Sequence, residues 1–344
     1  MTGQTNWKPL ALTMGEPAGI SAEITLKAWL GRSMNGVPPF YVIDDPSRLA
    51  DIAVGLRVEV PVHPIACPGE TLATFGAALP VLPLPLERRV TPGRPDPANT
   101  ATVLASIRRA VDAVRSGEAA AMVTNPINKE VLLRAGFSHP GHTEYLGELT
   151  GTAKPVMMLA CPGLRVVPVT VHLPLREAIS SLSTEAITHA GRVAAAALIS
   201  DFAIPHPRLV IAGLNPHAGE GGLLGREDID VIAPAVASLR AEGIDVSGPV
   251  PADSLFEVHA RAGYDAAVCM YHDQALIPLK TLDFEHGVDV TLGLPIVRTS
   301  PDHGTALEIA GKGVANESSL VSALRLACTI AANRARVHDG RTVA

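Results

Sequence analysis

Residues 208–217 read Arg-Leu-Val-Ile-Ala-Gly-Leu-Asn-Pro-His, an apolar and β-branched run that ends in a histidine. The same pattern occurs at residues 166–172 (Val-Val-Pro-Val-Thr-Val-His) and at residues 266–272 (Ala-Ala-Val-Cys-Met-Tyr-His). Runs of this length and composition predict buried strands of a largely parallel sheet. The three runs therefore indicate an α/β fold.

The histidines that end these runs, His172, His217 and His272, are candidate metal ligands. In open α/β sheets ligands bind beyond the carboxyl ends of the strands. Three imidazoles that follow separate strands and lie at this edge can bind one metal ion. They leave a coordination position of the ion open for substrate, which is typical of catalytic metal sites. A single histidine after a strand is more often a hydrogen-bonded loop residue, so the spacing alone leaves both interpretations open.

The composition is that of a large globular chain with an aliphatic core. The length of 344 residues predicts about two domains. Hydrophobic residues make up 47% and charged residues 18%, which excludes a disordered chain, and only 3% are aromatic. The formal net charge of −6 comes without a basic stripe, which argues against nucleic acid as a partner.

The four cysteines are scattered without a Cys-x-x-Cys pair, which is typical of proteins from a reducing compartment. The opening residues 1–7 are polar and do not resemble a signal peptide. No apolar stretch is long enough to cross a bilayer. We therefore expect a cytoplasmic protein that does not act at a membrane.

Strand and helix patterns alternate along the whole chain, which is typical of α/β proteins. The proline-rich segment 80–97 is predicted to be a long surface excursion. Strands are expected at residues 9–14, 40–43, 119–124, 156–161, 164–171, 208–214, 266–271 and 288–292, and helices at residues 20–30, 99–114, 183–200, 226–242, 303–311 and 317–337.

Two loops have further chemical interest. The glycine-rich segment 215–225 allows a ligand to approach the backbone closely, although a glycine-rich sequence alone is a weak indication of a binding site.

Thr143 is either the N-cap of a helix or a ligand contact, and Arg298 is the best candidate for an oxyanion clamp. The turn 15–19 is not a Gly-x-Gly-x-x-Gly fingerprint, which disfavours an ordinary Rossmann domain.

Over almost its full length the chain resembles the 4-hydroxythreonine-4-phosphate dehydrogenase family of vitamin B6 biosynthesis. The resemblance extends from residues 13–20 to residues 302–306. The motifs that carry it between these ends are Thr124-Asn125-Pro126, Gly141-His142-Thr143-Glu144, His172-Leu173-Pro174-Leu175-Arg176, Asn215–Gly222, Pro251–Phe256 and Tyr271-His272-Asp273-Gln274.

The resemblance implies a role for each matching position. The metal ligands would be the three histidines named above. The positions that contact the phosphorylated substrate match His142, Thr143, Lys280, Asp289 and Arg298. Asp289 departs from the family pattern, which usually has asparagine there. The candidates for cofactor binding are Gly219, Gly221, Gly222, His303, Gly304, Thr305, Ala306 and Asn316, and those for catalysis are Asp253, Asp273 and Lys280.

The fold implied is isocitrate/isopropylmalate dehydrogenase-like, with two α/β/α domains and a cleft between them. Residues 1–128 plus 299–344 would form the cofactor-side domain, and residues 129–298 the domain that binds the metal and dimerises. Members are homodimers in which the partner subunit completes the active site.

The reaction implied is the NAD- or NADP-dependent oxidation of 4-phosphooxy-L-threonine at its secondary alcohol, followed by decarboxylation to 3-amino-2-oxopropyl phosphate. Nitrogen ligands favour zinc, with cobalt and magnesium as alternatives. Asp253 and Asp273 are candidates for orienting the imidazoles or for joining the proton chain.

Three alternatives remain at this stage. A related metal-dependent dehydrogenase would act on 4-phosphoerythronate or phosphothreonate isomers, and Asp289 keeps that group open. A metallohydrolase would use the same three histidines to activate water, but it would not need the 303–316 loop. A catalytically silent binding protein would keep the pocket without histidines able to hold a metal.

Overall fold

The computed structural model describes residues 8–139 and 141–338, which fall into two compact units. One unit contains the chain up to Lys154 together with Leu294–Ala331, and the other contains Pro155–Gly293 together with the residues from Ala332. Residues 129–154 therefore belong with the first unit, whereas the sequence analysis assigned them to the second domain.

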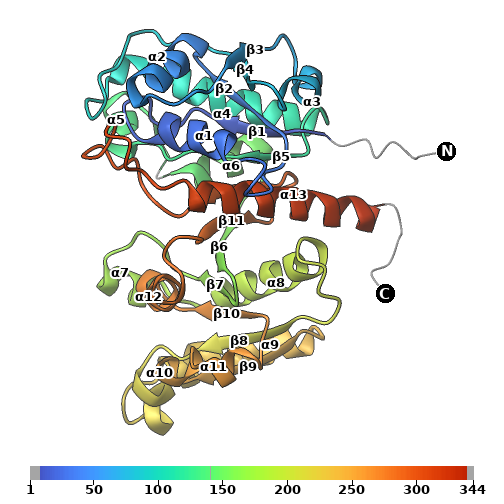
Figure 1. Cartoon of the computed structure of the whole chain (residues 1–344). Coiled ribbons are helices and arrows are strands. Elements are labelled where there is room, and N and C mark those ends of the chain that lie inside the picture. Colours follow the sequence, from blue (N-terminus) through green and yellow to red (C-terminus); the bar gives the residue numbers. More distant parts are fainter. Residues whose placement is uncertain (1–7, 140, 339–344) are drawn as a thin grey trace, which may run out of the picture. The chain divides into compact units, whose positions relative to one another are not determined.

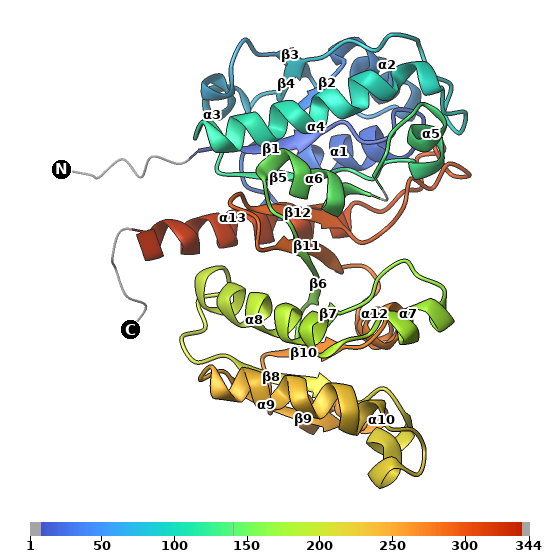
Figure 2. The same cartoon turned by 180° about the vertical axis from the view of Figure 1, so that it is seen from behind.

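The first unit is built on a parallel sheet with the strand order β3-β4-β2-β1-β5-β12. Helices α1 and α2 lie on one face of the sheet and α4 on the other (Figures 1 and 2). The strands are β1 (Leu10–Thr13), β2 (Phe40–Asp44), β3 (Val62–Pro64), β4 (Leu79–Pro83), β5 (Ala121–Val123) and β12 (Arg298–Pro301). The helices are α1 (Ser21–Leu30), α2 (Pro46–Leu56), α3 (Thr71–Thr74), α4 (Thr100–Arg115), α5 (Lys129–Arg134) and α6 (His142–Thr150), with 3-10 turns at Pro68–Glu70 and Pro97–Asn99. Helix α13 (Ser318–His338) belongs to this unit up to Ala331 and to the second unit from Ala332.

The second unit has the strand order β11-β6-β7-β10-β8-β9. β6 pairs antiparallel with both β11 and β7, and the remaining neighbours, from β7 to β9, pair parallel. Its strands are β6 (Val156–Cys161), β7 (Leu164–Pro168), β8 (Arg208–Ala212), β9 (Asp245–Val250), β10 (Ala266–Cys269) and β11 (Val288–Leu292). Its helices are α7 (Leu175–Ser181), α8 (Thr184–Ser200), α9 (Ala233–Ala241), α10 (Ala252–Leu255), α11 (Val258–Arg261) and α12 (His272–Leu282), with the tight turn η3 at Pro216–Gly222 and a π-helical turn at Asp228–Ile232.

The strands that precede the three histidines are neighbours. β10 lies between β7 and β8 and is parallel to both, so the three carboxyl ends meet at one edge of the sheet. Four of the five residues of β8 are buried, as are all four of β10. Strands buried on both faces explain the continuous apolar runs in the sequence, and the predicted arrangement of these strands is confirmed.

The buried core of the second unit is aliphatic, as the low aromatic content predicted, whereas that of the first unit also contains Tyr41, Phe137 and Tyr145. In the second unit Leu159, Val166, Val210 and Ala267 pack in one cluster. Local signals set the helix ends: the Ser183 hydroxyl accepts a hydrogen bond from the Ala186 amide and caps α8. Among the described residues, no helix combines the length and apolarity that a membrane crossing requires.

Several sequence predictions were wrong at the level of elements. Segment 80–97 is not wholly an excursion, because β4 extends to Pro83 and buries Pro80 and Val81. The helix expected at residues 303–311 is a series of turns, in which Ala306 takes a left-handed conformation with φ 43°. The helix expected at residues 226–242 is divided into the π-helical turn and α9.

Candidate functional site

His172 and His272 lie close together at the carboxyl edge of the second unit. Their ring centres are 5.9 Å apart and the ring planes are inclined by 40°. Two imidazoles that share an ion, at metal–nitrogen distances of about 2.0–2.1 Å, have ring centres about 5–6 Å apart. The observed spacing therefore fits two ligands of one metal ion.

Carboxylates contact the Nδ1 atoms of two of the predicted ligands. His272 Nδ1 lies 2.7 Å from Asp273 Oδ1, and His217 Nδ1 lies 3.0 Å from Glu220 Oε2. Histidines that bind metals usually donate one ring N–H to a carboxylate, which fixes the tautomer and leaves the other nitrogen for the metal. This arrangement leaves the Nε2 atoms of His217 and His272 for ligation. It also supports the predicted orienting role of Asp273.

His217 does not join the other two histidines in a three-ligand group. Within the described residues, no three His, Cys, Asp or Glu side chains of the chain are close enough to hold one ion. His217 lies in η3, five residues beyond the end of β8, and its side chain is 64% exposed. The structure thus brings together two of the three predicted ligands within one chain.

The loops that carry these histidines have strained backbones. Among the described residues, seven non-glycine residues have positive φ, and five of them are His172, His217, Ala218, Glu220 and Ala306. All five lie in segments predicted to form the site. A left-handed conformation costs an L-residue about 1–2 kcal/mol, and such strain concentrates at functional sites.

Gly219, Gly221 and Gly222 belong to the same left-handed turn as His217. Their φ values are 82°, 65° and 97°. A Cβ at Gly219 would lie 2.9 Å from the carbonyl oxygen of Gly225, so a side chain there would not fit without a shift. These glycines shape the loop that presents His217.

The predicted catalytic residues of the second unit line two adjoining pockets along α12. His272, Asp273 and Lys280 line a pocket of about 390 Å³. Asp273 also lines a second pocket, of about 650 Å³, with Asp253 and Tyr271. Asp289 lies on β11, where it is paired with Leu159 of β6. The structure therefore groups Asp273 with both other catalytic candidates.

In the first unit, Arg298 and His142 form a group suited to an anion. Arg298 is 2% exposed, and its Nε and Nη2 atoms donate to Thr124 Oγ1 at 3.1 and 2.7 Å. Thr124 follows β5, and Arg298 begins the adjacent strand β12. The guanidinium group is thus held in a fixed position beside the carboxyl end of β5. A planar cation of this kind is suited to binding a phosphate or carboxylate.

His142 begins helix α6, and its Nε2 atom is fully buried without a hydrogen-bond partner among the described residues. Burial, together with the positive charges of Arg298 and Lys129, holds the pKa of His142 well below its usual value, so the imidazole is neutral. A buried polar atom without a partner is costly, and a bound ligand would satisfy it.

Thr143 is not the N-cap of this helix, because Gly141 occupies that position. The structural role that the sequence left open for Thr143 is therefore wrong. The hydroxyl lies in the first turn of α6, beside His142. The amino end of a helix attracts anions, so this position is consistent with the predicted substrate contact.

The predicted cofactor loop, residues 303–316, packs against the turn that follows β1. The Ile20 amide donates to the Thr305 carbonyl at 3.1 Å. The Glu23 carboxylate accepts from the amides of Gly313 and Ala315 at 3.3 and 2.8 Å. These contacts fix the loop against α1.

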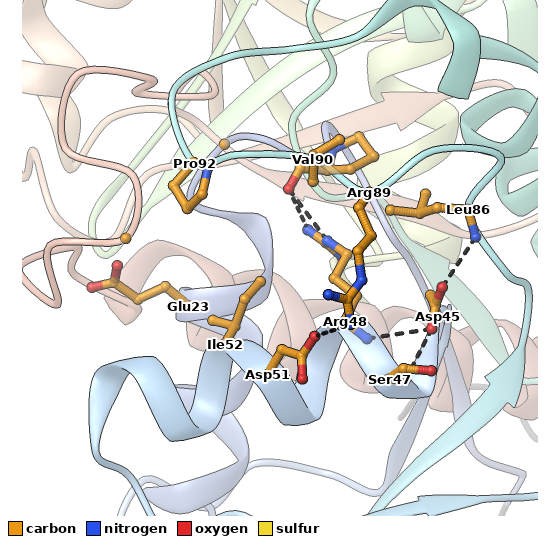
Figure 3. A pocket seen from close by; sticks show the side chains of 13 residues that line it. Glu23, Asp45, Ser47, Arg48, Asp51, Ile52, Leu86, Arg89, Val90 and Pro92 are labelled. Carbon is orange, nitrogen blue, oxygen red and sulfur yellow. Dashed lines mark hydrogen bonds and ion pairs between the residues drawn. The ribbon is translucent and has the colours of Figure 1, made fainter.

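A pocket of about 290 Å³ adjoins this loop (Figure 3). Its polar wall includes Arg48, which donates to the Pro17 carbonyl at 3.2 and 2.9 Å, and Arg89, which pairs with Asp51 at 3.2 Å. The residues that line it are Pro17, Gly19, Glu23, Asp45, Ser47, Arg48, Asp51, Ile52, Leu86, Arg89, Val90, Pro92 and Gly311. Its volume is near the lower end of the range for small-molecule sites.

Sequence reasoning missed three residues that support the site. Thr124 holds Arg298, Glu220 contacts His217, and the Gln274 side chain hydrogen-bonds to the backbone between the histidine-bearing strands. Each lies inside a motif that had been noticed, so the signal was present. The sequence did not indicate which residue each of them contacts in the fold.

Comparison with known proteins identifies the chain as an α/β oxidoreductase of the dehydrogenase class. A solved 4-hydroxythreonine-4-phosphate dehydrogenase from Klebsiella pneumoniae matches with a TM-score of 0.85 and 39% identity, over 94% of this chain and 99% of that one. A terephthalate 1,2-cis-dihydrodiol dehydrogenase from Burkholderia xenovorans is less similar, with a TM-score of 0.62 and 28% identity, over 94% and 98% of the two chains.

The family follows from the sequence. The model of the family described as pyridoxal phosphate biosynthetic protein PdxA matches residues 37–327. A 4-hydroxythreonine-4-phosphate dehydrogenase from Methylorubrum populi is 56% identical over 331 residues, which cover 94% of this chain and 95% of the relative. The chain therefore belongs to this family, and the predicted resemblance and α/β fold class are confirmed.

Proposed function

We propose that this protein oxidises 4-phosphooxy-L-threonine with NAD⁺ or NADP⁺ and releases CO₂ and 3-amino-2-oxopropyl phosphate. The observation that carries the proposal is the 56% identity, over nearly the whole chain, to a relative named for that substrate. Hydride leaves the carbon that bears the alcohol, and the alcohol proton is released. The resulting β-keto acid loses CO₂ and takes up one proton.

The imidazoles of His172 and His272 would hold a divalent metal, with His217 as the third ligand. Their ring spacing and the Asp273 carboxylate on His272 support this assignment. Nitrogen ligands favour zinc, with cobalt and magnesium as alternatives. When bound, the metal supplies Lewis-acid stabilisation of negative charge on the substrate oxygen.

The first unit would bind the phosphate group. The two hydrogen bonds to Thr124 fix the positively charged guanidinium group of Arg298, and neutral His142 donates or accepts one hydrogen bond without adding charge. In the second unit, Lys280 lines the same pocket as His272 and would hold a second anionic group. Asp273 would keep one His272 tautomer throughout the reaction.

The 303–316 loop would bind the adenosine portion of the nicotinamide cofactor. Its fixed attachment to Glu23 and the adjoining pocket support this assignment. We also propose a cytoplasmic location, because Cys67, Cys161, Cys269 and Cys328 are all free thiols, as is typical of proteins from reducing compartments.

The active form would be a homodimer in which His217 serves the metal site of the partner subunit. His172 and His272 form a pair in one chain, whereas His217 lies outside it on an exposed turn. In a twofold-symmetric dimer each chain gives and receives the same group. Both sites would then be complete.

The test of the function is a spectrophotometric assay of reduced cofactor with zinc, 4-phosphooxy-L-threonine and either NAD⁺ or NADP⁺. We expect turnover with this substrate, and none above background with 4-phosphoerythronate. Turnover with the sugar acid alone would overturn the assignment. His217→Ala should abolish turnover while leaving the circular dichroism spectrum unchanged.

A further inference from the structure

Two buried side chains connect the three strand ends that precede the histidines. The Thr170 hydroxyl, beyond the end of β7, donates to the Met270 carbonyl at 2.8 Å. The Gln274 side chain accepts from the Met270 amide at 2.7 Å and donates to the Gly213 carbonyl at 2.7 Å. Thr170, Met270, Gln274 and Gly213 therefore form one continuous chain of hydrogen bonds across β7, β10 and β8.

Each point of attachment is close to a proposed ligand. Thr170 and Met270 lie two residues before His172 and His272, and Gly213 lies four residues before His217. Thr170 and Gln274 are only 7% and 8% exposed. Water cannot readily replace a hydrogen bond that is lost in such surroundings, so the connections are costly to break.

The loops need this restraint because their backbones are strained. His172 has φ 50° and His217 has φ 52°, in the left-handed region that side chains rarely adopt. Such conformations persist only where the surrounding structure holds them. A metal ligand must also stay within about 0.5 Å of its productive position. Hydrogen bonds just before the strained residues meet both requirements.

We propose that Thr170 and Gln274 are positioning residues for the metal ligands of one chain. They hold the His172–His272 pair for that chain's own metal site and His217 for the site of the partner subunit. This inference rests on the proposed metal site, and the hydrogen bonds act through the backbone of the histidine-bearing segments. Loss of the Thr170 hydrogen bond, or of the two Gln274 hydrogen bonds, should loosen the site without removing a ligand.

The test is metal binding by the full-length protein, measured without turnover. Zinc affinity is obtained by competition with a chromophoric chelator, and the geometry is monitored by the visible absorption of bound cobalt. Thr170→Val removes the hydroxyl at nearly constant volume, whereas Thr170→Ser keeps it. Gln274→Met removes both amide hydrogen bonds at similar length.

The matched control is Thr188→Val. Thr188 is also 7% exposed, and its hydroxyl donates to the Thr184 carbonyl at 2.7 Å inside helix α8. This control loses the same kind of hydrogen bond in the same unit, but not between the histidine-bearing strands.

We expect Thr170→Val and Gln274→Met to weaken zinc binding about tenfold and to change the cobalt spectrum. Thr170→Ser and Thr188→Val should stay within about twofold of wild type. Unchanged zinc affinity and cobalt spectra in both Thr170→Val and Gln274→Met would refute the positioning role. If His272→Ala loses zinc binding in the same experiment, the proposed metal site is retained and only the positioning role is wrong. If wild type binds zinc no better than His272→Ala, the metal site itself is wrong and the inference falls with it. If Gln274→Met does not fold, the comparison of Thr170→Val with Thr170→Ser tests the positioning role by itself.

Discussion

At the scale of single residues, burial determines the charge of His142. The pKa of His142 is lowered in the folded protein, whereas a histidine in the unfolded chain has a pKa near 6.5. Below pH 6.5 the unfolded chain therefore binds a proton at this position that the folded chain does not bind. The stabilising contribution is therefore complete above pH 6.5 and is lost as the pH falls below it, by up to about 1.4 kcal/mol per pH unit.

The comparison that tests this is urea unfolding of wild type and His142→Gln at pH 7.5 and pH 5.5. We expect the free energy of unfolding of wild type to fall more steeply with acidification than that of the variant. Parallel curves for the two proteins would mean that His142 is protonated in the folded state.

The second prediction for a single residue concerns Arg298. Lysine keeps the positive charge but loses the planar group that donates twice to Thr124. We expect Arg298→Lys to raise KM for the phosphorylated substrate by about 10- to 100-fold, the range for lost hydrogen bonds to charged groups. Arg109→Lys is the control, because Arg109 is exposed and donates to the Pro83 carbonyl. Equal KM values for the two variants would remove Arg298 from the phosphate site.

At the scale of elements, an ion pair within the second unit joins Arg334, in the last turns of α13, to Asp201, which follows α8. Arg334 Nε and Nη2 donate to the two carboxylate oxygens of Asp201 at 2.7 and 2.8 Å, and Asp201 is 1% exposed. We expect Asp201→Ala to lower the free energy of unfolding by about 3 kcal/mol, since it leaves a partly buried guanidinium without this partner.

The same element-scale prediction has an internal control. Arg192 and Glu242 form an equally short bidentate pair in the same unit, but both side chains are exposed to solvent. Solvent screens such pairs, so Glu242→Ala should leave the unfolding midpoint nearly unchanged. Denaturant curves followed by circular dichroism check both variants. Equal losses in the two would show that burial does not set the strength of the Asp201 pair.

Elements with regular hydrophobic periodicity were predictable from sequence, and those set by tertiary contacts were not. The run before His272 gave β10, because a strand buried on both faces must be continuously apolar. In β4, prolines hid the alternation of Leu79 and Val81. In η3, His217 and Glu220 adopt left-handed conformations that no propensity favours for them. The candidate ligands could therefore be named from the sequence, but the position of His217 relative to the other two could not.

At the scale of the whole molecule, the separation of His217 from the His172–His272 pair has a measurable consequence. Each single variant, His217→Ala or His272→Ala, should be inactive alone. If His217 serves the partner's site, a mixed dimer of the two variants has one site with all three ligands and one site with only a single ligand.

An equimolar mixture that is unfolded and refolded together should therefore recover about a quarter of the wild-type activity, since half the dimers are mixed and each has one working site. Zinc analysis of the purified mixed dimer should find one tightly bound ion per dimer. The same treatment of His272→Ala with His172→Ala is the control. Those two ligands belong to one chain, so no mixed dimer has a complete site and activity should stay at background. No recovery in the test mixture would contradict a site shared in this way and would require His217 to reach the pair within its own chain. Recovery in the control would contradict it differently, because His172 and His272 of one chain would then serve different sites.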